Sequence, residues 1–203
     1  MSVIAKHLTP PSFSLRKRQQ QSVRTEIMQA AMTLFLNVGF EETVIDAIAD
    51  AANVSRSTVF RYFPTKEDIV VAWSLSSGEE LAEAVRRRPA GEAPVDCLCG
   101  ALLDHVLAHA DWEAAALAIG RLMETTPSLR ARSAEKYALW ERVLTEGFLS
   151  RDDGDPRQEP TVRVIAAAVM GVFRVSAQMW IERDGKEPLP EILAAGFATL
   201  KSR

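Results

Sequence analysis

A short segment near residue 60 places arginines and hydroxyl groups on one side of a predicted helix. In the stretch NVSRSTVFRYFPTKED (residues 53–68), Arg56, Ser57 and Arg61 share the outward face, and Val59 and Phe63 face inward. Guanidinium groups donate to phosphate oxygens and, in bidentate geometry, to O6 and N7 of guanine. The segment therefore predicts a surface that contacts the phosphates and base edges of nucleic acid.

Hydroxyl residues also stand where helices are expected to begin. Ser55 is placed to cap a helix over 55–62, and Thr43 and Thr65 each precede an acid by three residues, the pattern of a capping box. The free backbone N–H groups at such helix starts suit phosphate oxygens. Asn53 tolerates the left-handed conformation that a tight turn demands. Short helices joined by such a turn predict a helix-turn-helix.

The charge is unevenly distributed along the chain. The formal net charge is −3, yet residues 1–68 hold eight Lys and Arg against seven Asp and Glu, and the first 25 residues hold five basic residues and no acid. A basic surface at one end of an acidic chain fits a polyanionic partner. Asp46 and Asp50, on the helix before the turn, are expected to lower the affinity or to face solvent. The basic residues expected to follow the phosphates or enter the minor groove are Arg16, Lys17, Arg18 and Arg24.

Apolar residues recur at helical spacing through nearly the whole chain, and no stretch alternates as a strand does. The predicted fold is all-α, with about nine helices, and Gly39 is placed to end the first of them. Residues 1–23 are expected to form a flexible basic arm, followed by a helix-turn-helix domain over 24–68 and a helical domain over 69–203. The expected helices span 24–38, 44–52, 55–62, 66–88, 95–109, 112–124, 128–149, 161–183 and 189–201.

The helix-turn-helix segment resembles that of a known protein family. TVIDAIADAANVSRSTVFRYFPTKEDIV (43–70) resembles the N-terminal domain of the tetracycline-repressor (TetR) family of bacterial regulators, and the likeness covers about residues 24–75. It implies a homodimeric repressor that binds a palindromic double-stranded DNA operator and is released by a small-molecule effector. Phe60 departs from the family, where tyrosine is usual. With Thr58, Tyr62 and Lys66 carried over as contacts to the DNA backbone, the predicted DNA-binding residues are Thr43, Ser55, Arg56, Ser57, Thr58, Arg61, Tyr62 and Lys66.

The segment LAIGRLMETTPSLRARSAEKYALWERVL (117–144) resembles a C-terminal domain common among actinobacterial members, some of which resemble acyl-CoA-responsive regulators. The resemblance implies an effector that is small and hydrophobic, or anionic and acyl-CoA-like; a filled core is the alternative. Arg174 lies in an apolar helix, so it must pair with an acid, reach solvent or meet an anionic ligand. The predicted pocket residues are Trp112, Arg121, Met123, Trp140, Phe148, Met170, Phe173, Arg174 and Gln178.

Small residues such as Ala167 and Gly171 favour close approach of a second helix to the helix over 161–183. We predict that this helix and the helix over 189–201 form the homodimer interface, a four-helix bundle across a two-fold axis. A TetR-type activator or an effector-independent regulator remains an alternative, as does a helical interaction protein that no longer binds DNA.

Other classes of function find less support. Cys97, Cys99, His105 and His109 offer donors for a metal or thiol sensor, but no single helical face collects three of them, so the expectation is no metal and no cofactor. No catalytic constellation is present, and we expect no enzyme. No run reaches the roughly 18–20 apolar residues of a membrane span. Two cysteines make no disulfide framework, which favours the cytoplasm.

Overall fold

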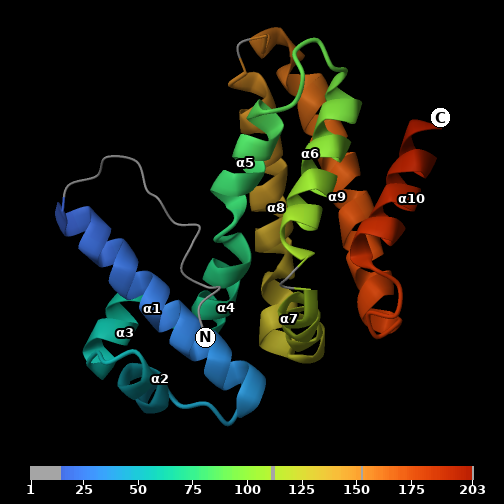
Figure 1. Ribbon diagram of the computed structural model, residues 1–203. Coiled ribbons are helices and arrows are strands. Elements are labelled where there is room, and N and C mark those ends of the chain that lie inside the picture. The colour runs from blue at the N-terminus through green and yellow to red at the C-terminus, as the bar shows by residue number, and fades with distance from the viewer. Residues whose placement is uncertain (1–14, 111–112, 152, 203) are drawn as a thin grey trace. The chain divides into compact units, whose positions relative to one another are not determined.

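The protein, described here by a computed structural model, is all-α over residues 15–110, 113–151 and 153–202, with no strand in these ranges (Figure 1). The predicted fold class is confirmed. The chain divides into two compact units, residues 1–70 and 71–203. Each unit is described by itself.

The first unit contains three helices, α1 (Leu15–Asn37), α2 (Ile45–Ala51) and α3 (Arg56–Tyr62). They bury a small apolar core, and Gly39 ends the α1 segment in the left-handed region with φ of 111°. Residues 15–23 are helical, so the first helix begins nine residues before the expected start at residue 24; the flexibility of the arm over 1–23 stays a prediction, and residues 1–14 lie outside the described ranges. The core residues are Ile27, Ala31, Phe35, Phe40, Ile48, Val59 and Phe63.

The expected long helix over 66–88 is instead two helices, α4 (Lys66–Leu75) and α5 (Gly78–Arg86). The break falls in a Ser-Ser-Gly sequence, whose residues favour helices weakly. The hydroxyl of Ser76 donates to the carbonyl of Trp73 at 2.7 Å, which offers the backbone a local alternative to continued helix. The segment is therefore a pair of helices joined at residues 76–77.

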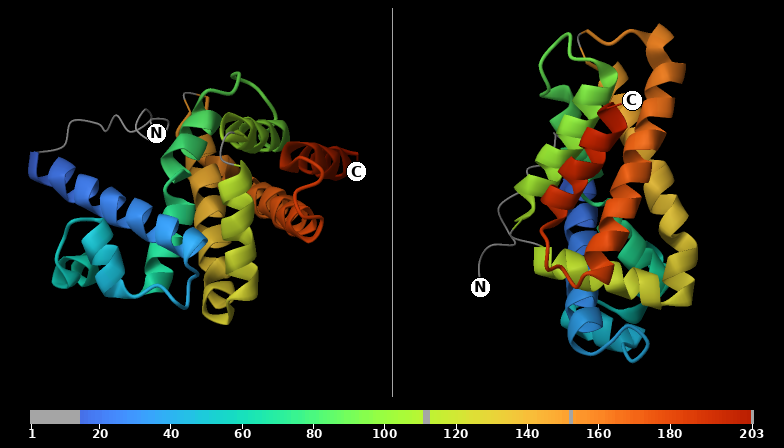
Figure 2. Two further views of the ribbon diagram at one scale, coloured as in Figure 1. Left: turned by 60° about the horizontal axis from the view of Figure 1, so that its bottom comes forward. Right: turned by 90° about the vertical axis from the view of Figure 1, so that its right-hand side faces the viewer.

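The second unit is a ring of four helices in which each packs on the next (Figure 2): α5, α6 (Pro94–Ala108), α9 (Glu159–Glu182) and α8 (Pro127–Leu149). The helix α10 (Leu189–Lys201) packs on α6 and α9, and α7 (Glu113–Thr125) packs on α8 and α9. A short 3₁₀ turn, Pro156–Gln158, precedes α9. The ring encloses the main hydrophobic core, which includes Leu81, Leu98, Leu102, Leu144, Val169, Met170 and Leu193.

Among the described residues, one segment, Pro156–Glu182, is long and apolar enough to cross a membrane by length and composition. Its helix α9 packs against α6, α8 and α10, so its apolar residues serve the core of the bundle. Two valines on its outer side, Val164 and Val175, remain exposed.

A buried arginine fastens the end of α8 to the loop after α5. The Arg151 side chain is 3% exposed; it donates to the carbonyl of Pro89 at 2.6 Å and pairs with Asp153 at 2.9 Å. Asp153 in turn accepts from the Gly91 amide at 2.7 Å. These bonds hold the pKa of Asp153 at about 2. The loop is therefore fixed by one connected set of polar contacts.

Candidate nucleic-acid interface and ligand site

The start of α3 is capped as predicted. Ser55 has an extended backbone, and its hydroxyl accepts from the Thr58 amide at 3.2 Å, which satisfies one of the free N–H groups of the first turn. Val59 and Phe63 are almost fully buried and anchor the inner face of the helix. Ser57 is exposed, as the outward face requires. The helix therefore presents the predicted polar face to solvent.

The turn between α2 and α3 also follows the prediction. Asn53 has φ of 52°, in the left-handed region that asparagine tolerates. The amide of Val54 donates to the carbonyl of Ala49 at 2.9 Å, which closes the end of α2. This turn sets the direction in which α3 leaves α2.

Both arginines of α3 are exposed and lie against aromatic rings. The Arg56 guanidinium is 5.5 Å from the Phe60 ring centre, and that of Arg61 is 5.3 Å from the Tyr62 ring centre. Arg56 also pairs with Asp46 at 3.1 Å, with both side chains 61% exposed. Such exposed pairs contribute little to stability, so Arg56 can exchange Asp46 for a phosphate or a base edge at small cost. In the free protein, the pair with Asp46 holds Arg56 beside α2.

Two predicted DNA contacts have internal roles. Thr43 is 2% exposed and its hydroxyl donates to the carbonyl of Gly39 at 2.6 Å; the N-cap of α2 is Val44, without a side-chain bond, so the capping box at Thr43 is wrong. Lys66 directs its ammonium at the carbonyls of Phe40 (2.6 Å), Thr43 (3.0 Å) and Glu41 (3.3 Å). These contacts occupy its three donors. Lys66 therefore fixes the loop before α2 instead of offering a free ammonium to DNA.

The other predicted contacts have mixed surroundings. Thr65 and Asp68 form the expected capping box, with Thr65 N donating to Asp68 Oδ2 at 2.9 Å and Asp68 N donating to Thr65 Oγ1 at 3.2 Å. Thr58 shares a hydrogen bond with Ser55 at 2.9 Å. The Arg24 guanidinium lies 4.9 Å from the Phe63 ring centre. Of the predicted basic arm, the side chains of residues 16–18 lie outside the described ones.

In the second unit, the ring of helices brings three aromatic side chains together. Trp140 of α8 stacks on Phe173 of α9 with centroids 5.5 Å apart, and His105 of α6 meets the Trp140 edge at 5.7 Å. Burial, together with the nearby His109, lowers the pKa of His105 to about 4. Trp140 and Phe173 were both predicted pocket residues, and tertiary packing places them in contact.

Sequence reasoning missed Lys136, which carries the main charge of this cluster. Its ammonium lies 5.4 Å, 5.6 Å and 5.7 Å from the ring centres of Tyr137, Trp140 and Phe173. Burial lowers its pKa to about 8, against the opposing charge of Glu124, and Lys136 forms no ion pair with a carboxylate of the described residues. The indole Nε1 of Trp140 is buried and lacks an acceptor in the described part of the chain. The sequence signal was the spacing Lys136-Tyr137-x-x-Trp140, one helical turn.

Most other predicted pocket residues lie elsewhere. Arg121 pairs with Asp184, and Phe148 stands 5.3 Å from the Arg151 guanidinium. Arg174 is exposed, so of the three possibilities the single chain realises contact with solvent, and Gln178 is exposed and donates to Glu182 at 3.0 Å. The residues Met123 and Met170 are buried in the core, and Trp112 lies outside the described residues.

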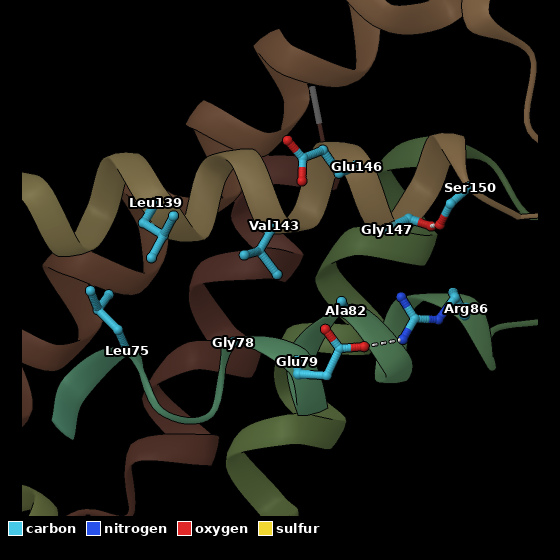
Figure 3. Close-up of a pocket in the computed structure, with 10 residues that line it drawn as sticks. All are labelled: Leu75, Gly78, Glu79, Ala82, Arg86, Leu139, Val143, Glu146, Gly147 and Ser150. Atoms are coloured by element: carbon cyan, nitrogen blue, oxygen red, sulfur yellow. Dashed lines mark hydrogen bonds and ion pairs between the residues drawn. The ribbon is translucent and has the colours of Figure 1, made fainter. Parts of the chain in front are cut away.

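A groove of about 450 Å³ runs between α5 and α8 (Figure 3). Figure 3 shows Leu75, Leu139 and Val143 pointing into it, and none of the predicted pocket residues lines it. Glu79 and Arg86 on its side pair with each other at 2.8 Å. The groove offers apolar surface, but these two charges satisfy each other, whereas Lys136 and Trp140 hold unsatisfied donors.

The cysteines do not form a sensor site with the histidines. Cys97 and Cys99 are buried, and burial raises the pKa of the Cys97 thiol and raises that of Cys99 to about 11. Reactive cysteines need the thiolate form, so both thiols are poorly suited to redox sensing.

Known proteins share this arrangement. Residues 27–73 match the model of bacterial regulatory proteins of the tetR family, and residues 92–203 match that of the MftR C-terminal domain. The chain is 31% identical over 181 residues to the HTH-type transcriptional regulator TcmR of Streptomyces glaucescens, covering 86% of this chain and 80% of TcmR. It is 28% identical over 192 residues to the mycofactocin biosynthesis transcriptional regulator MftR of Mycobacterium tuberculosis, covering 92% and 93%.

A solved structure agrees with these relatives. FadR of Thermus thermophilus, a TetR family transcriptional repressor in complex with lauroyl-CoA, is similar with a TM-score of 0.61 and 27% identity, over 87% of this chain and 92% of that one. The helix-turn-helix geometry, both family models and these relatives agree. The chain belongs to the TetR family of bacterial DNA-binding transcriptional regulators.

Proposed function

We propose that this regulator is a homodimeric repressor that binds a palindromic operator and releases it when an apolar effector with an anionic group binds the second unit. The observation that carries the proposal is the outward face of α3, where Arg56, Ser57 and Arg61 are exposed on a helix anchored by buried Val59 and Phe63. The FadR repressor supports the direction of regulation. The site of action is the cytoplasm, where bacterial DNA is found.

The helix α3 enters the major groove of one half-site in this proposal. Arg61 binds a guanine edge or a phosphate, and Arg56 leaves Asp46 to do the same. Ser55, Ser57, Thr58 and Tyr62 supply hydroxyls to the phosphates, whereas Thr43 and Lys66 hold the loop that positions α2. The domain boundaries follow, with a DNA-binding domain over 24–68 and an effector-binding and dimerisation domain over 69–203.

In the proposed dimer, a second copy of this chain packs against the outer sides of α9 and α10. Val164 is 71% exposed and Val175 47% exposed on α9, and a Cβ added at Gly171 between them meets nothing within 4 Å. Ala194 and Ala198 are exposed on α10. This face combines apolar and small residues, which permits close approach across a two-fold axis. Two-fold pairing sets the α3 helices for half-sites about 34–36 Å apart.

The effector is proposed to bind at the aromatic cluster between α8 and α9. Lys136 supplies a cation without a carboxylate partner among the described residues, and Trp140 supplies an unused N–H. Buried polar groups are normally paired, so these two donors fit a ligand that brings an oxyanion or carbonyl together with apolar groups. The acyl-CoA bound by FadR belongs to this chemical class.

Release of the operator follows from a shift between two arrangements of the dimer. An effector can shift this equilibrium only by the difference between its affinities for the two arrangements. If a saturating effector left the operator affinity unchanged, the release step would be wrong.

The experiment is fluorescence anisotropy with DNA from upstream of the protein's own gene, measured over a salt series. Wild type is compared with Arg61→Ala and with Arg157→Ala, a matched loss of one arginine from the second unit, whose side chain is 91% exposed. We expect steeply salt-dependent, sequence-specific binding. Arg61→Ala should lose about 1–3 kcal/mol of discrimination at one base position, and Arg157→Ala should lose none.

Equal and weak binding of all three proteins to every sequence calls for selection from random DNA. If that selection also yields no preferred sequence, the DNA-reading assignment of α3 is wrong.

A further inference from the structure

The imidazole of His109, just after the end of α6, lies between two acceptors. Its Nδ1 is 2.8 Å from the backbone carbonyl of His105, and its Nε2 is 2.8 Å from Oε2 of Glu80 on α5. A carbonyl only accepts, so Nδ1 carries a hydrogen and Nε2 faces the carboxylate. The position between Nε2 and Glu80 Oε2 therefore takes either the second proton of an imidazolium or a metal cation.

A second imidazole lies beside this position. His105 and His109 occur four residues apart, with their rings 4.5 Å apart. The ligand atoms of Glu80, His105 and His109 all lie within 4.8 Å of one another. Two histidines at this spacing on a helix, with a carboxylate added, form a donor set known from zinc sites. The donors come from α5 and the α6 segment, which pack together in the ring.

We propose that Glu80, His105 and His109 form a site for Zn²⁺, with a fourth position open to water. Zinc binds imidazole nitrogen at about 2.0–2.1 Å, so tetrahedral ligands lie about 3.4 Å apart. The widest separation, at most 4.8 Å, must shorten by about 1.4 Å, and the 2.8 Å between Glu80 Oε2 and His109 Nε2 must open by about 0.6 Å, both within reach of side-chain rotation. The Glu80 and His109 side chains, 42% and 37% exposed, have room to rotate and leave a path from solvent.

Two further features agree with zinc. The hydrogen bond from His109 Nδ1 to the His105 carbonyl is the kind that orients an imidazole in metal sites. The cysteines cannot supply the fourth ligand, because Cys97 and Cys99 stand twelve and ten residues before His109 along the α6 segment, roughly 18 Å and 15 Å away. The Cys97 sulfur instead accepts from Arg151 at 2.9 Å.

Bound zinc would connect α5 to α6 and stabilise the second unit by an amount that grows with the logarithm of the free metal concentration above Kd. Zinc binding at this site is independent of the operator and the effector proposed above, and it is measured with the metal alone.

The test is isothermal titration of the full-length, chelator-treated protein with ZnCl₂. We expect one Zn²⁺ per chain. Glu80→Gln and His109→Gln should each weaken the affinity more than about 100-fold, because loss of even an outer partner of a ligand costs about 10–100-fold. Glu83→Gln, the matched loss of a carboxylate one turn further along α5, should leave the affinity unchanged. Far-UV circular dichroism verifies that each variant is folded.

Cobalt(II) in place of zinc identifies the ligands. We expect the visible bands of a tetrahedral nitrogen and oxygen site, without thiolate charge-transfer bands. Three results would overturn the proposal. They are the absence of stoichiometric zinc binding, a zinc affinity of the folded Glu80→Gln and His109→Gln variants equal to that of wild type, and thiolate bands that assign the metal to the cysteines.

Discussion

Replacing Lys136 with methionine should make this protein more stable at neutral pH. The ammonium is half-buried among three aromatic rings, and burial lowers its pKa from 10.5 to about 8. The unfolded chain holds the proton up to about pH 10.5, whereas the folded chain releases it near pH 8. Each unit of pKa difference corresponds to about 1.36 kcal/mol, so the charge lowers the free energy of unfolding by about 3 kcal/mol at pH 7. Partial exposure reduces the expected gain of Lys136→Met to about 2 kcal/mol.

The pH dependence has a defined sign. Between about pH 8 and 10.5 the unfolded state binds more protons than the folded state, so the stability of wild type rises with pH in that window. The advantage of Lys136→Met is therefore largest below pH 8 and disappears towards pH 10.5. The presence of Lys136 in this protein fits a charge that is kept for ligand binding at a cost in stability.

Urea unfolding followed by tryptophan fluorescence measures this effect. All four tryptophans lie in residues 71–203, so the signal reports the second unit. Wild type and variant are compared at one protein concentration, because dimer stability depends on it. Lys186→Met, at an exposed lysine, is the control. If Lys136→Met is less stable than wild type at pH 7, or if the difference stays constant up to pH 10, the account of Lys136 is wrong.

Four further substitutions test other parts of the structure. Lys66→Met leaves three backbone carbonyls without their donor and should destabilise the first unit by about 1.5–3 kcal/mol in thermal unfolding, with weaker operator binding; unchanged stability would contradict the role of Lys66. Arg151→Met leaves the carbonyl of Pro89 and the Asp153 carboxylate without their donor and should cost about 1–3 kcal/mol in urea unfolding. Asp153 contributes stability above about pH 3.8 that is lost as pH falls towards 2, and Asp153→Asn should remove this acid dependence in acid titration. Gly171→Leu should shift the elution volume in size-exclusion chromatography to that of a monomer, and an unchanged dimer would place the interface elsewhere.

The helical fold and the DNA-reading face could be predicted because local rules fix them. Ser55 caps α3 and Asn53 takes the left-handed turn as their side chains dictate, and the family motifs fall in this same segment. The prediction failed where a local pattern met a competing contact. Thr43 stands three residues before an acid, as a capping residue does, but its hydroxyl donates a hydrogen bond to the carbonyl of Gly39. The Ser-Ser-Gly sequence ended a helix that periodicity alone extended to residue 88.

The sequence by itself determined that the fold is all-α, where α3 begins and which side of it faces solvent, because these depend on hydrogen bonds and periodicity within a few residues. Only the tertiary structure decided that Lys136 lies among aromatic rings, that Lys66 serves the loop before α2, and that Glu80 meets His109. These contacts join segments that lie far apart in the sequence, such as Lys136 of α8 and Phe173 of α9. Their positions depend on how the helices pack, and helical spacing along one segment carries no record of the neighbour that a side chain will meet.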